Sequence, residues 1–410
     1  MVNKLNLSKS ESLFAEAKKL SPGGVMGIRR PYNFVVGEYP VFIKEGYGGH
    51  IIDEDGNDYI DMLCAYGPII LGYVEPEINN EVIKQLSKGF CFSLVQKWQN
   101  ILLQRLVDLI PCAEMGILVK TGSDAASCAV RIARGHTGRD KVIRCGYHGW
   151  HDWCVEVRGG VPKGTYQDTL EFHYNDLDGL KKLFAENKDQ IACVIITGVG
   201  HPLNDPVVEP LEGFLEGVKS LCHENGAVFI MDEIRTGFRF GLGGAQQRYG
   251  VTPDLAVFGK ALANGYPISV VLGKENIMKI AEKEVFISST FFPNSLEMIA
   301  ALKCLEIMEK EKVAEDIWKR GLEFNNRLEA IASKLPYKVT VSKVPPMPFV
   351  TFDRDDDGKY KDRRTQFYTG AIRRGLFIQP YHHWYIAYRH TDADLEKALN
   401  IIEESFKDTI

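Results

Sequence analysis

The sequence predicts an α/β protein whose larger part is a mainly parallel sheet covered by helices. Between about residues 95 and 290, short apolar runs alternate repeatedly with amphipathic helical stretches. The runs are apolar at successive positions, which is typical of strands that are buried on both faces. Ligands of such sheets bind at the carboxyl ends of the strands. The residues that end each run are therefore the first candidates for a functional site.

The strands of this sheet can be placed in order along the chain. The apolar runs lie at residues 116–120, 141–144, 191–196, 227–231, 255–258 and 268–272. Amphipathic stretches such as residues 211–224 separate them, and apolar residues at helical spacing predict helices there. We therefore expect a strand at each run and helices between the runs.

The two ends of the chain predict a smaller α+β domain. Ser8 and Glu11 have the spacing of a capping box that opens a helix. Residues 35–43 and 50–52, with a turn at 53–57, predict a small meander. Further helices are expected at residues 296–335, 363–374 and 392–406. We expect residues 1–70 to join the small domain, residues 71–310 to form the large domain and residues 311–410 to complete the small domain.

Composition excludes several classes of partner. The 410 residues carry a formal net charge of −5 with acids and bases interspersed, so we expect neither nucleic acid nor a membrane surface as a partner. No run approaches the roughly 20 apolar residues that span a bilayer, and the first residues do not have the pattern of a secretion signal. The nine cysteines are scattered without a C-x-x-C pair, so the cytoplasm is the expected compartment.

Two charged residues end neighbouring apolar runs. Asp232 ends the run 227–231, where a carboxylate can hold a proton on a heteroaromatic nitrogen. Lys260 follows the run 255–258, and a lysine that is partly desolvated there has a lowered pKa and a nucleophilic amine. For Asp232 alone, the structural alternative is a helix cap or a surface salt bridge. For Lys260 alone, it is a lysine at the surface. Their pairing favours a catalytic site.

Two further segments have the residue types of a cofactor site. Residues 121–126 place Gly122 and Ser123 at the start of a predicted helix, where free N–H groups and the helix dipole favour a phosphate, although a plain N-cap fits as well. Tyr147 follows the run 141–144, where its ring can stack on a planar ligand. His148 and His151 have no third ligand nearby, so we expect no metal.

In this order, the phosphate segment, the tyrosine, the aspartate and the lysine resemble the class III aminotransferases, which use pyridoxal phosphate. The likeness covers nearly the whole chain and is strongest to the branch that contains glutamate-1-semialdehyde aminomutase. It rests on the motifs at residues 21–24, 52–61, 67–72, 232–238, 243–246 and 250–260. The resemblance implies a fold-type I transferase, with a mainly parallel seven-stranded sheet, helices on both faces and a smaller α+β domain.

The resemblance also implies a role for each matching residue. Lys260 would form a Schiff base with pyridoxal 5'-phosphate and then move protons, and Asp232 would hold the pyridinium nitrogen. Tyr147 would stack on one face of the ring, and Ile234 would pack on the other.

The phosphate would be bound from two subunits. Gly122 and Ser123 match the family's own phosphate-binding position, and Thr290 matches the position that reaches the phosphate of the neighbouring subunit. The resemblance therefore implies a homodimer with shared active sites.

The expected reaction moves an amino group from an amino acid, L-glutamate above all, to an aldehyde or ketone. Two departures from the aminomutase, the missing Glu-Pro motif at residues 196–199 and the Thr-Phe-Phe loop at Thr290, resemble aminotransferases that act on sugars and ulosonic acids. We expect amino-sugar biosynthesis on this ground. Residues expected to bind substrate are Arg30, Tyr66, His201 and His382, with solvated or packing roles as the alternatives.

Two other readings stay open. An intramolecular aminomutase of the glutamate-1-semialdehyde type, or an epimerase, would use the same residues without a second substrate. A non-catalytic relative that binds a ligand as a scaffold would not need Lys260, Asp232 and Tyr147 together.

Overall fold

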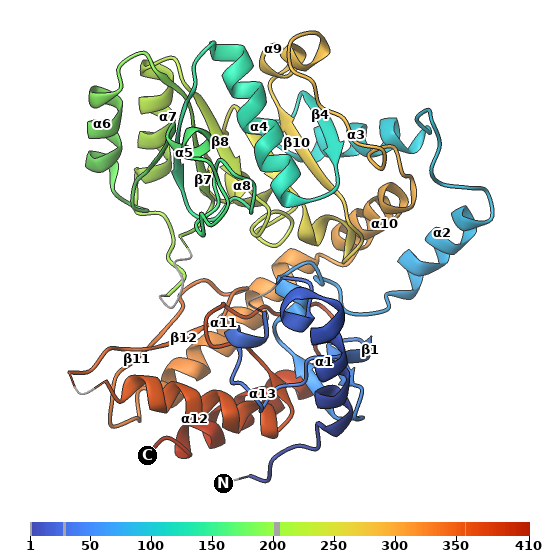
Figure 1. The fold of residues 1–410 in the computed structure, drawn as a ribbon, viewed down its shortest axis with the longest axis vertical. Helices are drawn as coiled ribbons and strands as arrows, with labels where there is room; N and C mark the ends of the chain where they lie inside the picture. Colours follow the sequence, from blue (N-terminus) through green and yellow to red (C-terminus); the bar gives the residue numbers. More distant parts are fainter. Residues whose placement is uncertain (1, 28–29, 201–205, 357) are drawn as a thin grey trace. The chain divides into compact units, whose positions relative to one another are not determined.

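The computed structural model describes residues 2–27, 30–200, 206–356 and 358–410. The chain divides into two compact units, and the ribbon in Figure 1 shows the elements of each. The first unit comprises Met1–Glu75, His201–Val208 and Glu315–Ile410, and the second comprises Pro76–Gly200 and Glu209–Ala314. The first unit therefore combines the two ends of the chain, which are blue and red in Figure 1.

The second unit is built on a seven-stranded sheet with the order β4-β10-β9-β8-β7-β5-β6. Its strands are β4 (Met115–Val119), β5 (Lys141–Cys145), β6 (Thr169–Glu171), β7 (Ile191–Thr197), β8 (Val228–Asp232), β9 (Leu255–Phe258) and β10 (Ser269–Gly273). Strand β10 pairs antiparallel with β4 and β9, and the other pairs are parallel. The expected mainly parallel α/β sheet is confirmed.

Helices cover this sheet because its central strands are apolar at every position. All residues of β7, β8, β9 and β10 are buried, which requires cover on both faces. Figure 1 shows α4 running across the sheet, where it contacts β7 to β10. The helices of this unit are α2 (Pro76–Leu86), α3 (Trp98–Leu109), α4 (Gly122–Thr137), α5 (Lys163–Tyr166), α6 (Leu177–Glu186), α7 (Phe214–Glu224), α8 (Gly244–Tyr249), α9 (Glu275–Met278) and α10 (Leu296–Lys310).

The first unit contains two smaller sheets. One has the order β1-β2-β3-β13 and the other pairs β11 with β12. Their strands are β1 (Ile43–Tyr47), β2 (His50–Asp53), β3 (Asp58–Asp61), β11 (Val339–Val341), β12 (Val350–Phe352) and β13 (Leu376–Phe377). The helices of the unit are α1 (Ser8–Leu20), α11 (Val313–Ala332), α12 (Tyr360–Arg373) and α13 (Asp392–Lys407).

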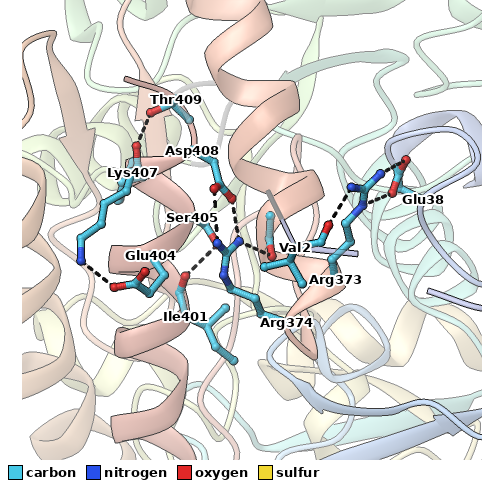
Figure 2. A network of polar contacts seen from close by, with 12 residues as sticks. Val2, Glu38, Arg373, Arg374, Ile401, Glu404, Ser405, Lys407, Asp408 and Thr409 are labelled. Atoms are coloured by element: carbon cyan, nitrogen blue, oxygen red, sulfur yellow. Dashed lines mark hydrogen bonds and ion pairs between the residues drawn. The ribbon is translucent and has the colours of Figure 1, made fainter. Parts of the chain in front are cut away.

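Two arginines at the end of α12 connect distant segments of the first unit, as Figure 2 shows. Arg373 donates to both carboxylate oxygens of Glu38, at 2.7 and 2.8 Å, and to the carbonyl of Val2 at 3.0 Å. Arg374 donates to Asp408 at 2.6 and 3.3 Å. Bidentate pairs of this kind fix the orientation of both partners. The end of α12 therefore holds residues from both ends of the chain in place.

Two local predictions for the N-terminal segment are wrong. Helix α1 begins at Ser8 without a side-chain cap from the preceding residue, because Asp55 accepts hydrogen bonds from the backbone N–H groups of Lys9 at 2.8 Å and Ser10 at 2.9 Å. The strand expected at 35–43 starts only at Ile43, because residues 35–40 form turns. Both differences arise from contacts or turns that sequence spacing does not reveal.

The described residues show no membrane-spanning helix, no cluster of metal ligands and no disulfide. None of the helices that the structure describes is long and apolar enough to cross a membrane. Among the described residues, no group of three or more His, Cys, Asp or Glu side chains is placed to hold a metal ion. The nine cysteines are all free thiols, and eight of them are buried.

A buried histidine makes the stability of the first unit dependent on pH. His390 accepts a hydrogen bond from the Ala387 N–H at 3.0 Å and donates through Nε2 to the Asp61 carbonyl at 3.1 Å, so its ring is neutral. Burial lowers its pKa from 6.5 to about 4. The unfolded chain therefore binds the proton more tightly, and we expect the free energy of unfolding to fall by about 3 kcal/mol as pH drops from 7 to 4.

Urea unfolding of the wild-type protein and of His390→Gln at several pH values tests this expectation. The variant should be less stable at pH 7, and the difference between the two proteins should shrink toward pH 4, because the variant does not have the group that titrates. A difference that stays constant with pH would show that the pKa of His390 is the same in the folded and unfolded states.

Candidate active site

The candidate site begins with two residues at the carboxyl edge of the large sheet. Asp232 is the last residue of β8, and Lys260 follows β9 at the start of a short 3-10 helix, Lys260–Ala263. The two strands are parallel neighbours, with Asp232 paired in register with Val257. Both side chains therefore leave the sheet at the edge where ligands bind.

Asp232 is held by hydrogen bonds on both carboxylate oxygens. Its Oδ1 accepts from the Ile234 N–H at 3.0 Å, and its Oδ2 lies 2.7 Å from Nδ1 of the buried His148. The other ring nitrogen of His148 lies 3.2 Å from the Cys145 carbonyl oxygen. Both ring nitrogens of His148 therefore face oxygen atoms. His148 was absent from the predicted site residues, and its contact orients the Asp232 carboxylate.

The environment of Lys260 favours the neutral form of its amine. Burial lowers the pKa of this amine well below its usual range, the positive charges of Arg235 and Arg239 lower it further, and Asp232 opposes the shift. The residue also has a left-handed φ of 43°, a conformation that costs about 1 kcal/mol or more for a side chain of this type. Strain at this position is consistent with a functional requirement on where the amine lies.

The start of α4 supplies the expected phosphate position. Thr121 caps the helix in a reciprocal capping box with Asp124, and Gly122 and Ser123 form the first turn. The Ser123 hydroxyl accepts a hydrogen bond from the Trp150 N–H at 3.3 Å. A helix start with capped geometry leaves N–H groups that favour an anion.

Ile234 connects the helix start to the lysine segment. A Cβ on Gly122 would lie 3.2 Å from Ile234 Cγ2, and a Cβ on Gly259 would lie 3.0 Å from Ile234 Cδ1. The isoleucine side chain therefore lies between the first turn of α4 and the residue before Lys260. This location agrees with the expected packing of Ile234 on a planar cofactor.

The side chains of Tyr147 and Thr290 are more exposed than those of the other expected cofactor residues. The Tyr147 ring is 48% exposed, and the Arg235 guanidinium lies 5.8 Å from its centroid. Thr290 lies in an exposed turn, and among the residues that the structure describes its side chain makes no hydrogen bond. Stacking by Tyr147 and a role for Thr290 in a second subunit stay predictions.

The residues expected to bind substrate belong to the first unit, where three of them lie together. The Arg30 guanidinium is 5.7 Å from the Tyr66 ring centroid, and the rings of Tyr66 and His382 meet edge-on at 5.1 Å. Gln379 donates to the Tyr66 hydroxyl at 3.0 Å. His201, the fourth expected residue, lies outside the described residues.

A strained turn presents Tyr66 to this cluster. Cys64, Ala65 and Tyr66 have left-handed φ values of 49°, 53° and 67°. The following Gly67 has a φ of 103°, and a Cβ there would lie 2.8 Å from the Tyr385 ring. Consecutive left-handed residues other than glycine are costly and cluster at functional sites.

Gly149 makes the close approach between the loop after β5 and the start of α4. Its φ is +119°, and a Cβ would lie 2.4 Å from the Ser123 hydroxyl oxygen. We expect Gly149→Ala to displace Ser123 and weaken pyridoxal phosphate binding by about tenfold or more, since both the strain and the clash act at the phosphate position. Titration of the apoprotein with the cofactor, followed by absorbance, measures the effect.

Gly138→Ala is the matched control for this substitution. Gly138 also has a left-handed φ, +66°, but a Cβ there meets no atom within 4 Å. This variant should lose stability and keep the cofactor affinity of the wild type. If the Gly149 and Gly138 variants bind the cofactor with equal affinity, Ser123 is not part of the phosphate site.

The second unit thus fits a cofactor with an aldehyde, a basic ring nitrogen and a phosphate. Lys260 offers an amine whose pKa is lowered, Asp232 a carboxyl group held by hydrogen bonds, and Gly122 with Ser123 a helix start. Pyridoxal phosphate has this combination of groups, and it supplies an electron sink for the carbon that carries the nitrogen.

Comparisons with known proteins agree with this geometry. The family model described as aminotransferase class-III matches residues 33–406. A 3-aminobutyryl-CoA aminotransferase of Cloacimonas acidaminovorans (strain Evry) is 54% identical over 406 residues, covering 99% of this chain and 98% of the relative. A glutamate-1-semialdehyde 2,1-aminomutase of Methanosphaera stadtmanae is 34% identical, covering 97% and 98% of the two chains.

A solved structure supports the same assignment. The PLP internal aldimine form of the FumI protein of Sphingopyxis sp. MTA144 superposes with a TM-score of 0.93 at 28% identity, covering 98% of this chain and 96% of the other. Sequence motifs, site geometry and these similarities agree on one family. The chain belongs to the class-III aminotransferases, and it is an enzyme that uses pyridoxal phosphate.

Proposed function

We propose that the enzyme exchanges an amino group between carbon 3 of a 3-aminoacyl-CoA thioester, such as 3-aminobutyryl-CoA, and a 2-oxo acid, with L-glutamate as the amino-acid partner. The observation that carries this proposal is the 54% identity, over nearly the full length of both chains, to a protein named for that substrate. The reverse direction aminates a 3-oxoacyl thioester, which is a ketone. The proposed reaction therefore has a ketone as its amino acceptor, as the sequence analysis expected.

The chemistry at carbon 3 accounts for the arrangement of Lys260 and Asp232. The thioester carbonyl is one carbon too far from carbon 3 to stabilise negative charge there, so this stabilisation has to come from the cofactor ring. Lys260 Nζ, whose pKa burial lowers, is the group that accepts the proton from carbon 3 and returns it. Asp232, oriented by His148, would hold the proton on the ring nitrogen of the bound cofactor.

The cluster of the first unit suits the second substrate. A 2-oxo acid carries a carboxylate, and Arg30 supplies a guanidinium beside the Tyr66 ring. His382 donates from Nδ1 to the His383 carbonyl at 2.7 Å, which fixes the orientation of its ring. We assign carboxylate binding to Arg30 and positioning of the substrate to Tyr66 and His382.

The sugar acceptor that the sequence analysis expected has less support. It rests on the Thr-Phe-Phe loop and the missing Glu-Pro motif at residues 196–199, whereas the relative's name points to a thioester. We retain sugar aldehydes as comparison substrates for the assay.

A homodimer with shared sites is part of the proposal. Large apolar side chains are exposed around the Thr290 segment, with 80% of Phe286 and 60% of Phe291 accessible. Leu94, in another segment of the same unit, is 81% exposed. Exposed apolar residues of this size are typical of an interface. Light scattering on the purified enzyme should give twice the mass of the chain, and we keep the cytoplasm as the expected compartment.

An assay with purified, cofactor-loaded enzyme tests the reaction. 3-Aminobutyryl-CoA and 2-oxoglutarate together should yield L-glutamate and the 3-oxo thioester in equal amounts, and omission of either substrate should stop turnover. Conversion of glutamate-1-semialdehyde without any acceptor would favour the aminomutase, to which relatives at 34% and 35% identity belong. Turnover of sugar aldehydes alone would overturn the thioester assignment.

A further inference from the structure

A polar cavity of about 440 Å³ in the first unit is not used by the mechanism above. It lies between strand β12, the first turns of α12 and the segment that precedes His382. Figure 1 labels β12 and α12. Its volume falls in the range of small-ligand sites, about 300 to 1,000 Å³. Its polar and aromatic lining comes from Thr340, Thr351, Arg354, Tyr360, Arg364 and Tyr381.

The charges around this cavity favour an anion. Arg354 is exposed and makes no ion pair with any residue that the structure describes. Arg364 donates to the Tyr381 hydroxyl at 3.1 Å. The carboxylate of Asp353 also lines the cavity, but it lies 2.8 Å from Lys338 Nζ and accepts from the Thr340 hydroxyl at 2.8 Å. The charged residues that line the cavity are therefore two arginines and one carboxylate that is already paired with Lys338.

The cavity also offers flat surfaces for a heteroaromatic ring. The Arg364 guanidinium lies 4.5 Å from the centroid of the Tyr381 ring, and Tyr360 adds a second ring to the lining. Purine bases stack on aromatic rings and on guanidinium planes. Thr351 also lines the cavity. Guanidinium groups and stacking surfaces together suit a phosphorylated purine nucleoside.

Contacts within the first unit connect this cavity to the expected substrate cluster. Tyr381 lines the cavity, and the next residue is His382. The His382 ring packs edge-on against Tyr66, which lies beside Arg30. The cavity and the expected substrate cluster are therefore joined through adjacent residues of one unit.

We propose that the cavity binds the adenosine 3′-phosphate 5′-diphosphate end of the CoA thioester. This inference rests on the proposed function. Arg354 and Arg364 bind the phosphates, and the adenine stacks against Tyr360 and Tyr381. The cavity then makes the enzyme selective for CoA thioesters over shorter thioesters of the same acyl group.

Truncation of the substrate tests this proposal together with substitution of the cavity. The wild-type enzyme, Arg354→Gln, Arg364→Gln and the control Arg327→Gln are assayed with 3-aminobutyryl-CoA and with S-(3-aminobutyryl)pantetheine, which carries no nucleotide. Arg327 pairs with Glu396 outside the cavity. Loss of a charge-assisted contact should raise KM for the CoA thioester about tenfold in each cavity variant. KM for the pantetheine thioester, and kcat with either thioester, should not change.

Direct binding provides a readout independent of turnover. Titration calorimetry with adenosine 3′,5′-bisphosphate should detect binding to the wild type and to the Arg327 variant, and affinity about tenfold lower for each cavity variant. If the CoA thioester is a substrate but the cavity variants raise KM equally for both thioesters, the inference fails and the proposed function stands. If neither thioester is converted, the proposed function fails, and the inference fails with it.

Discussion

Replacement of Lys260 by alanine is expected to lower turnover by about 10⁴-fold or more, because the variant loses both the amine that bonds the cofactor and the group that moves the proton. Lys260 is the lysine after β9 whose pKa is held well below its usual range by burial. Steady-state assays with the substrates proposed above measure the loss. The visible spectrum of the loaded protein should change at the same time.

Two comparisons separate this role from a structural one. Added methylamine should restore part of the activity of Lys260→Ala, because a small free amine can take the place of the missing proton acceptor. Lys182→Ala, an exposed lysine on α6 that pairs with Glu186, is the matched control and should keep the wild-type rate. Wild-type activity in Lys260→Ala would contradict the mechanism.

The pH profile of the wild type follows from the same pKa. Because burial and neighbouring arginines lower the pKa of Lys260, the amine is neutral above that pKa and protonated below it. We expect turnover to stay high from pH 7 to 9 and to fall in acid. A profile that rises only near the ordinary lysine pKa of about 10.4 would show that the amine is not desolvated.

Substitution of Asp232 by asparagine is expected to lower kcat by about 10² to 10³-fold, because a neutral amide does not stabilise a positive charge on the ring nitrogen. The substitution keeps the size of the side chain, and folding should be little affected. Single-turnover kinetics of the loaded variant measure the chemical step directly. A larger loss in cofactor affinity than in kcat would assign Asp232 to binding instead.

His148 acts through Asp232 and is therefore a positioning residue. His148→Gln should lower kcat less than Asp232→Asn does, and the double variant should be no slower than Asp232→Asn alone. Asp254→Asn is the control, since Asp254 is a buried carboxylate just before the opposite end of β9, where it pairs with Lys274 and His223. It should lose stability and retain kcat. Additive losses in the double variant would separate His148 from the carboxylate.

The sheet could be predicted because its strands are apolar at every position. The six runs that the sequence analysis named correspond to β4, β5 and β7 to β10. Strand β6 was missed, since it has three residues and none of them is buried. Short edge strands have no burial pattern to detect.

The candidate catalytic pair was also accessible from the sequence. Asp232 and Lys260 end apolar runs, and parallel strands bring their carboxyl ends to one edge. The long-range partners were not accessible. His148 is 84 residues from Asp232 along the chain, and no local pattern marks a hydrogen bond over that separation.

The amino-acid sequence by itself determined the α/β class, the order of most elements and the family, because burial periodicity and short motifs are local properties of the chain. Tertiary structure decided which groups touch. It placed His148 on Asp232, Ile234 between Gly122 and Gly259, and Asp55 at the start of α1. It also formed the cavity beside Tyr381 from segments that are distant in sequence. Contacts of this kind depend on how folded elements pack, and packing is a property of the whole fold.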